Sequence, residues 1–289
     1  MASLKDVKMK ISGVKKTSQI TSAMNMVAAA KLRGAQTRME NFRPYAGKFK
    51  EAMGNLSGSM DPAQFPLMEK REVRSVELVV VTSDRGLCGS FNANIINTAL
   101  KLIRHYTAEG KKVSLVCVGK KGFQKLRRAG NVRKSYTDIM GTFQMFNARS
   151  IAQDVAENFL NGGADEVRVL YGEFKSVAVQ RPANLQLLPI EKVGVDADAA
   201  PAMVDYIYEP NPNDIMDVLL PLYLNVMTYH AMLEVSAGEH AARMTAMDNA
   251  TKACSDMINS LTLVYNKVRQ SSITAELMDI VGGAEALKG

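Results

Sequence analysis

Residues 211–283 decide the fold of this chain. They read NPNDIMDVLLPLYLNVMTYHAMLEVSAGEHAARMTAMDNATKACSDMINSLTLVYNKVRQSSITAELMDIVGG. Pro212 occupies the position of a first helical residue, and Asn211 before it is a preferred N-cap. Glycine commonly ends helices, so Gly282 and Gly283 mark the expected end. The stretch is therefore predicted to form one very long helix.

One face of this helix carries a heptad repeat. The repeat has eighteen positions, spaced alternately by three and four: Leu219, Leu222, Val226, Tyr229, Leu233, Ser236, His240, Arg243, Met247, Ala250, Cys254, Met257, Leu261, Val264, Val268, Ser271, Ala275 and Met278. Fourteen of them are apolar, and the exceptions are Ser236, His240, Arg243 and Ser271. At 1.5 Å per residue the helix is roughly 100 Å long. An equally long partner is needed to cover the repeat.

The N-terminus supplies that partner, a helix over residues 1–57. Ser3 and Asp6 resemble a capping box at its start. Its apolar repeat runs from Leu4 to Leu56, so Pro44 is expected to kink the helix without ending it. The turn-rich residues 55–66 stop it.

Residues 70–209 change from helical spacing to alternating strands and helices, which indicates an open α/β sheet. Strands are predicted at Val76–Val81, Val113–Val118, Val167–Tyr171, Val177–Val179, Leu185–Ile190 and Asp205–Tyr208, and helices at Asn94–Tyr106, Gln124–Arg128 and Ser150–Leu160. The predicted fold is therefore a long antiparallel coiled coil of the two terminal helices (1–57 and 211–285), with a Rossmann-like open α/β domain (70–209) inserted between them.

Both terminal helices join the inserted domain, so their paired residue numbers should sum to about 268. Ser18, Thr21 and Asn25 are then expected to face Ala250, Met247 and Arg243, forming a polar layer. This pairing leaves residues 268–283, about 20 to 25 Å of helix, without a partner in the chain. Another chain is expected to cover that overhang, and the alternatives are a folded-back tail or self-association.

Charge and cysteine content set limits on partners and compartment. The net charge of +7 is too small to demand nucleic acid. Residues 1–51 hold eleven basic and three acidic side chains, a basic stripe that suits an acidic partner or is simply a solvated helix face. The three cysteines are far apart, which favours a reducing compartment. No uninterrupted apolar run is long enough to span a membrane.

The turn after the first strand, Asp84-Arg85-Gly86-Leu87-Cys88-Gly89-Ser90, lies where doubly wound folds bind nucleotides. It matches neither phosphate-binding glycine motif, so a structural turn is favoured. Cys88 has no triad partner, and no carboxylate pair or His cluster indicates catalysis, a cofactor or a metal. The alternatives left open are a nucleotide-binding α/β enzyme with a helical dimerisation arm and a structural coiled-coil adaptor.

Four stretches resemble a known family. They are Gln270–Ala284 with its Ile-Thr-x-Glu, acid and Gly-Ala spacing, Ile20–Leu32, Ser83–Asn92 and Glu239–Met244. These four stretches, in their order along the chain, are similar to those of the gamma subunit of the rotary F-type ATP synthase, of bacterial type. No insertion with a close cysteine pair is present, so the redox control of the plant plastid form is not expected.

The resemblance implies a non-catalytic rotor subunit without a cofactor. Its coiled coil would be the central shaft inside three alpha and three beta subunits, and its α/β domain would meet the epsilon subunit and the ring of c subunits. Proton flow would turn the c ring and the shaft, and beta would make ATP. The location implied is the cytoplasmic face of the bacterial plasma membrane, held peripherally through the complex.

The resemblance also implies site residues. The residues implied to contact the moving loops of beta are Met24, Arg243, Arg269, Gln270, Thr274 and Glu276. The residues implied to contact the c ring are Tyr208 and Glu209.

Overall fold

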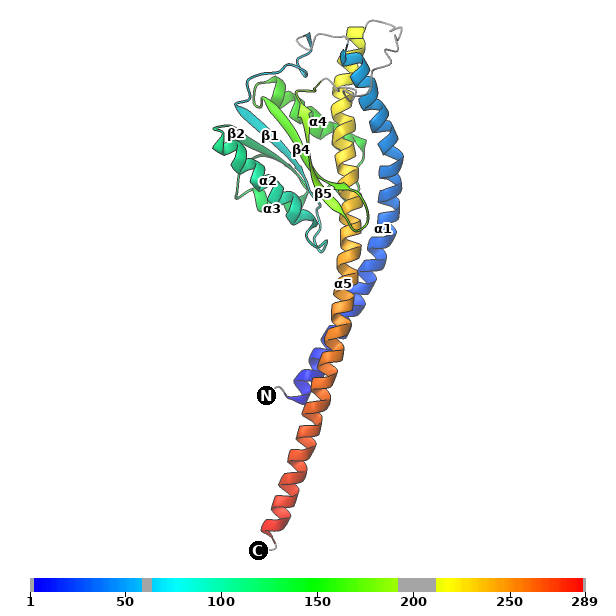
Figure 1. The fold of residues 1–289 in the computed structure, drawn as a ribbon, viewed down its shortest axis with the longest axis vertical. Helices are drawn as coiled ribbons and strands as arrows, with labels where there is room; N and C mark the ends of the chain where they lie inside the picture. Colours follow the sequence, from blue (N-terminus) through cyan, green and yellow to red (C-terminus); the bar gives the residue numbers. More distant parts are fainter. Residues whose placement is uncertain (1–2, 59–63, 192–211, 288–289) are drawn as a thin grey trace, which may run out of the picture. The chain divides into compact units, whose positions relative to one another are not determined.

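The structure is a computed structural model that describes residues 3–58, 64–191 and 212–287. Its elements, shown in Figure 1, are α1 (Leu4–Gly58), β1 (Ser75–Val81), α2 (Phe91–Ala108), β2 (Lys112–Val118), α3 (Lys120–Leu126), β3 (Asn131–Tyr136), α4 (Met145–Leu160), β4 (Glu166–Phe174), β5 (Gln180–Leu188) and α5 (Pro212–Ala286). The chain divides into two compact units. The terminal unit is Met1–Ala28 with Met244–Gly289, and the sheet unit is Ala29–Arg243.

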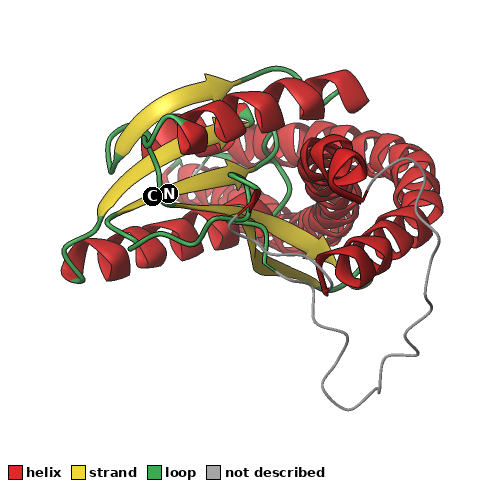
Figure 2. Cartoon of the chain, turned by 90° about the horizontal axis from the view of Figure 1, so that it is seen from above, coloured by secondary structure: helices red, strands yellow, loops and turns green. Residues whose placement is uncertain are grey.

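The sheet unit contains one five-stranded sheet with the order β3-β2-β1-β4-β5. All neighbours are parallel except β4 and β5, which pair antiparallel. Helices cover both faces (Figure 2). Successive residues of β1 point to opposite faces, and Glu77 meets α4 on one of them, where its Oε1 accepts a hydrogen bond from Asn158 at 3.2 Å.

The strands predicted at Val76–Val81, Val113–Val118 and Val167–Tyr171 are confirmed as β1, β2 and β4. All three are rich in β-branched residues and largely buried, which is typical of the interior strands of a parallel sheet. The helices predicted at Asn94–Tyr106 and Ser150–Leu160 are confirmed and begin a few residues earlier. The short helix predicted at Gln124–Arg128 lies instead at Lys120–Leu126.

The strand predicted at Val177–Val179 is wrong. These residues form the turn between β4 and β5, where the Val179 N–H donates to the Ser176 carbonyl at 3.2 Å. Strand β3 was not predicted; it lies at one edge of the sheet and is mostly exposed. Its Arg133 and Lys134 hide the apolar alternation, as charged residues commonly do on edge strands. The strand predicted at Asp205–Tyr208 lies outside the described residues.

Helix α1 begins at the predicted capping box. The Asp6 N–H donates to Ser3 Oγ and the Ser3 N–H donates to Asp6 Oδ2, both at 3.2 Å. The helix continues through Pro44, as expected. Helix α5 continues through Gly282 and Gly283 to Ala286, so the predicted end is wrong. Each glycine costs a helix only about 1 kcal/mol relative to alanine, which is too little to end one this long.

Within each unit α1 and α5 make antiparallel contacts. In the sheet unit Phe42 packs edge-on against Tyr229, and Phe49 stacks on Tyr223. In the terminal unit the hydroxyls of Thr21 and Thr251 are 2.7 Å apart. These pairs sum to 271 or 272, close to the expected 268.

The expected partners in the polar layer are displaced. Thr21 meets Thr251 rather than Met247, because two hydroxyls satisfy each other whereas a thioether is a weak acceptor. The Asn25 amide donates to the Met244 carbonyl at 3.4 Å, and Arg243 turns instead toward a loop of the sheet unit. The layer therefore exists in the terminal unit, but without Arg243.

Part of α5 is buried on every side. Residues 231–239 are all buried, including Glu234, Ser236 and Glu239. One window within Asp214–Ala286 is long and apolar enough to cross a bilayer, a possibility that counting uninterrupted apolar runs did not reveal. Because 61% of that window is buried in the protein, its hydropathy is that of a core helix.

Candidate partner-contact site

The loop after β1 is held by polar contacts within the chain. The Asp84 carboxylate accepts hydrogen bonds from the backbone N–H groups of Lys120, Asp138 and Met140 at 2.8 to 2.9 Å. The Ser83 N–H donates to Asn92 Oδ1 at 3.0 Å. A carboxylate therefore occupies these amide donors, where a nucleotide-binding fold would present donors to a phosphate. This arrangement agrees with the predicted structural turn.

Arg243 of α5 binds the same loop through hydrogen bonds to Gly86. Its Nη2 donates to the Gly86 carbonyl at 2.9 Å and to Glu239 Oε1 at 2.5 Å, and its Nε donates to the same carbonyl at 3.2 Å. Arg243 and Glu239 are both buried. Burial raises the pKa of Glu239, and the positive charge of Arg243 opposes that rise. The pair therefore links two turns of α5 to the loop.

His240 lies beside this pair. Nη1 of Arg243 is 3.4 Å from His240 Nδ1, which must be the acceptor because a guanidinium can only donate. Burial, followed by the positive charge of Arg243, lowers the pKa of His240 to about 4. His240 is therefore a neutral acceptor in the folded chain.

Arg243, which the resemblance assigns to a partner, thus uses its donors inside the sheet unit. What the loop presents outward is Leu87, whose side chain is 63% exposed. Leu87 has a φ of 61°, in a region that non-glycine residues seldom adopt. The exposure of Leu87 was not predicted, because a leucine inside a glycine turn does not indicate which way its side chain points.

The other implied beta contacts lie in the terminal unit. Met24 is half-buried, whereas Arg269, Gln270, Thr274 and Glu276 are exposed on α5. The Thr274 hydroxyl donates back to the Gln270 carbonyl at 2.9 Å. Tyr208 and Glu209, the implied c-ring contacts, lie outside the described residues.

The end of α5 is the least covered part of the described chain. Every residue from Ile273 to Leu287 is exposed, and α5 runs on past the beginning of α1 (Figure 1). We call residues 273–287 the tip. Its large exposed apolar side chains are Ile273, Leu277, Met278, Ile280, Val281 and Leu287. The expected overhang is confirmed, and the folded-back alternative is wrong, because the tip is helical and exposed.

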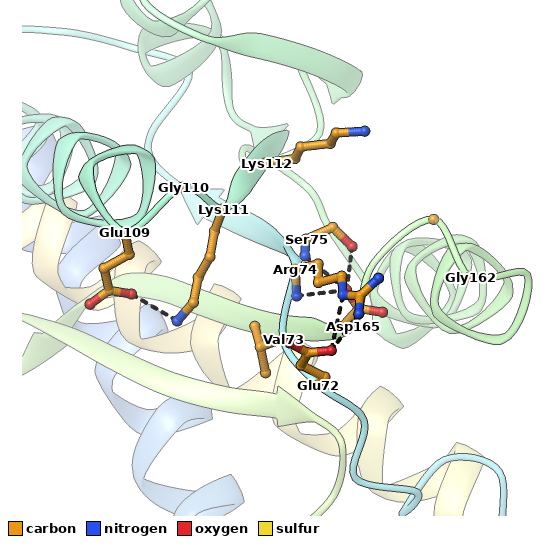
Figure 3. A pocket seen from close by; sticks show the side chains of 11 residues that line it. Glu72, Val73, Arg74, Ser75, Glu109, Gly110, Lys111, Lys112, Gly162 and Asp165 are labelled. Carbon is orange, nitrogen blue, oxygen red and sulfur yellow. Dashed lines mark hydrogen bonds and ion pairs between the residues drawn. The ribbon is translucent and has the colours of Figure 1, made fainter.

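A shallow pocket of about 700 Å³ lies near the amino ends of β1 and β2 (Figure 3). Five of its six charged side chains have partners: Arg74 pairs with Glu72, Lys111 pairs with Glu109, and Asp165 accepts from the backbone and hydroxyl of Ser75, which leaves Lys112. Open α/β sheets bind ligands at the opposite, carboxyl ends of their strands. This pocket therefore has few groups left to bind a small molecule.

The cysteines are free thiols. Burial raises the pKa of Cys117 to about 12 and also raises the pKa of Cys88, so neither is activated as a nucleophile. In the part of the chain that the structure describes, no group of three or more His, Cys, Asp or Glu side chains could hold a metal ion.

Comparison with known proteins adds a family to this geometry. A family model described as ATP synthase matches residues 3–287. The ATP synthase gamma chain of Desulfotalea psychrophila is 64% identical over 290 residues, and that of Nitratidesulfovibrio vulgaris (Hildenborough) is 55% identical over 292 residues. In both comparisons the match covers 100% of each chain.

Solved structures agree. A chain in the central stalk and c-ring structure of the Tetrahymena thermophila mitochondrial ATP synthase has a TM-score of 0.61 and 29% identity, covering 80% of this chain and 99% of that one. A chain of the Euglena gracilis mitochondrial ATP synthase has a TM-score of 0.69 over 98% of this chain and 94% of its own, and its 22% identity makes it evidence for the fold alone. The chain therefore belongs to the ATP synthase gamma chain family.

Proposed function

We propose that this chain is the central rotor shaft of an F-type ATP synthase. It couples proton-driven rotation of the membrane c ring to the conformational cycle of the catalytic beta subunits. The observation that carries the proposal is the tip, a helical segment whose apolar side chains find no cover in the described chain. Burying one such side chain fully is worth roughly 1.5 to 3 kcal/mol, so an enclosing partner gains several times that.

The proposed partners follow from the family. Three alpha and three beta subunits enclose the terminal unit, and the epsilon subunit and c ring meet the sheet unit. Met24, Arg269, Gln270, Thr274 and Glu276 are proposed to contact beta directly. Arg243 is proposed to act there by holding the loop that presents Leu87. Tyr208 and Glu209 are proposed to contact the c ring.

The finer description of the architecture is also a proposal. We infer that α1 and α5 form an antiparallel coiled coil and that the sheet is Rossmann-like. The antiparallel helix contacts and the strand order β3-β2-β1-β4 support this. The proposed domains are residues 1–57, 70–209 and 211–285.

The chain is proposed to be a non-catalytic subunit without a cofactor, held peripherally on the cytoplasmic face of the bacterial inner membrane. The unactivated thiols and the loop closed by Asp84 support a role without chemistry of its own. Titrating the isolated chain with ATP and with NAD in a calorimeter tests the rival reading, a nucleotide-binding enzyme with a helical dimerisation arm. We expect no binding heat, and stoichiometric binding of either nucleotide would favour the rival.

The rotor itself is tested by Glu276→Ala in the complete complex in vesicles. Torque passes through two packed helices rather than through one contact, so ATP synthesis should fall only modestly. Loss of most synthesis with normal assembly would contradict a shaft that works by stiffness. Lys252→Ala, a substitution of another exposed residue on α5, is the matched control.

A further inference from the structure

An ion pair in the sheet unit, between the buried side chain of Glu234 and the side chain of Arg43, which is 41% exposed, joins three segments that are far apart in sequence. Glu234 of α5 is 1% exposed in its side chain, and its Oε1 accepts a hydrogen bond from Arg43 Nε of α1 at 2.9 Å. Its Oε2 accepts from Arg43 Nη2 at 3.1 Å and from the Phe174 N–H at 2.8 Å. Phe174 is the last residue of β4. One carboxylate thus contacts α1 and the sheet from α5.

The contacts close a ring. Arg43 Nη2 also donates to the Phe174 carbonyl at 2.7 Å, so both backbone polar groups of Phe174 are bound by the two long helices. We call Arg43, Glu234 and Phe174 the helix–sheet clamp. Hydrogen bonds to charged groups are shorter and stronger than neutral ones and depend on direction. The hydrogen bond from Arg43 to Glu234 raises the pKa of the guanidinium.

His230, one helical turn away, completes the surroundings. Its Nε2 is 3.3 Å from Glu234 Oε1, and its ring meets Tyr171 of β4 edge-on. Burial lowers the pKa of His230, which keeps the ring neutral and leaves Arg43 as the cation that pairs with Glu234.

The clamp differs from the apolar contacts around it. Aromatic pairs such as Phe42 with Tyr229 exclude water, but they tolerate small rotations between helices. A bidentate pair that also holds a strand end fixes both the register of the helices and their orientation to the sheet. Under the proposed function, the sheet receives torque from the c ring and must pass it to α1 and α5.

Resting on the proposed function, we propose that Arg43 and Glu234 are positioning residues for energy coupling. They form the joint through which the sheet passes torque to α1 and α5. Neither residue touches a reacting group, and the joint is built entirely within the sheet unit.

The test separates the joint from the fold. Arg43→Met with Glu234→Met removes the directional bonds without leaving a buried charge unpaired, and such exchanges are commonly tolerated. The complete complex is reconstituted in vesicles, and proton uptake per ATP hydrolysed is measured. Angular fluctuations of a bead fixed to the sheet unit, with the alpha and beta subunits immobilised, are also recorded. Arg74→Met with Glu72→Met, an exposed arginine–glutamate pair in the same sheet unit, is the matched control.

We expect the clamp variant to assemble normally and to hydrolyse ATP near the control rate. Proton uptake per ATP should fall about twofold and the angular fluctuations should broaden, because the strongest directional contacts at the joint are gone. The single variants Arg43→Met and Glu234→Met should show the same two changes as the double variant, because neither residue forms the clamp without the other. Only the wild type, which has both residues, should show full coupling and narrow fluctuations. Coupling and fluctuations equal to the control would overturn the proposal and leave the rotor standing. A wild-type complex whose bead does not rotate would overturn both.

Discussion

Arg243 and Gly86 are joined by two hydrogen bonds, because both Nε and Nη2 of the guanidinium donate to the same carbonyl oxygen. The two residues are 157 positions apart in the chain. Nη2 also donates a hydrogen bond to Glu239, so the negative charge of this carboxylate balances the positive charge of Arg243 in the protein interior. The loop that presents Leu87 is thus attached to α5 by a charged anchor.

Removing that anchor should destabilise the sheet unit. Arg243→Met leaves Glu239 buried and unpaired, and breaking such a pair costs about 3 to 5 kcal/mol. Glu239→Gln should cost less, because a neutral amide can still accept from Arg243. Urea unfolding followed by circular dichroism measures both. Lys252→Met, which breaks an exposed pair on the same helix, should leave stability nearly unchanged. A loss for Arg243→Met as small as that of Lys252→Met would refute the anchor.

Stability should fall with acid through His240. Its folded pKa of about 4 lies below the usual value, so the unfolded chain binds the proton first as pH falls. The stabilisation is complete above the unfolded pKa of about 6.5 and is lost as pH falls toward 4. His240→Gln keeps a neutral acceptor, so the difference between wild type and variant should shrink with falling pH. Arg243, Lys31, Arg38 and Arg85 are the charges that oppose protonation of His240. Parallel stability curves for the two proteins from pH 7 to pH 4 would exclude this role.

The two threonines of the terminal unit should be coupled. Thr21→Val removes one hydroxyl of the 2.7 Å pair and should cost about 1 kcal/mol. The Thr251 hydroxyl also donates to the Met247 carbonyl, so it keeps one partner. The double variant with Thr251→Val should therefore cost less than the sum of the single variants. Thr262→Val, on the exposed side of α5, is the control for valine in this helix. Strict additivity would show that the pair contributes nothing.

The tip should matter for assembly and not for folding. Leu277 and Ile280 are 56% and 67% exposed, so Leu277→Asp with Ile280→Asp should leave unfolding of the isolated chain unchanged. In the complex both side chains lose apolar burial worth roughly 1.5 to 3 kcal/mol each, so binding to alpha and beta should weaken at least about a hundredfold. Val218→Asp, on the same helix and 69% exposed, should not weaken it. Equal binding by all three proteins would show that the tip is not enclosed.

The long helices and the interior strands could be predicted because their patterns are strong. The heptad spacing in α1 and α5 and the β-branched run in β1 each repeat one signal over many residues. Edge strand β3 could not be found, because its exposed face carries charges rather than an apolar alternation. The end of α5 was predicted wrongly for a different reason. The two glycines near its end weaken the helix, but they do not determine where it ends.

The exposure of the implied contact residues could be predicted only on the overhang. Arg269, Gln270, Thr274 and Glu276 lie there and are exposed, as the pairing of the helices predicts, and their contact with beta stays a prediction from the resemblance. The side chain of Arg243 points toward the carbonyl of Gly86. This is a tertiary contact, and the spacing of residues along a helix does not predict it. The clamp at Glu234 could not be predicted for the same reason, because an acidic residue among apolar ones does not indicate a partner 191 positions away.

Whether other subunits enclose the tip can be seen by electron microscopy of the complex, purified through a tag on this chain. We expect one copy of the chain per ring of six alternating alpha and beta subunits, with residues 273–287 inside the ring. A tip in open solvent, or more than one copy of the chain in each ring, would contradict this expectation.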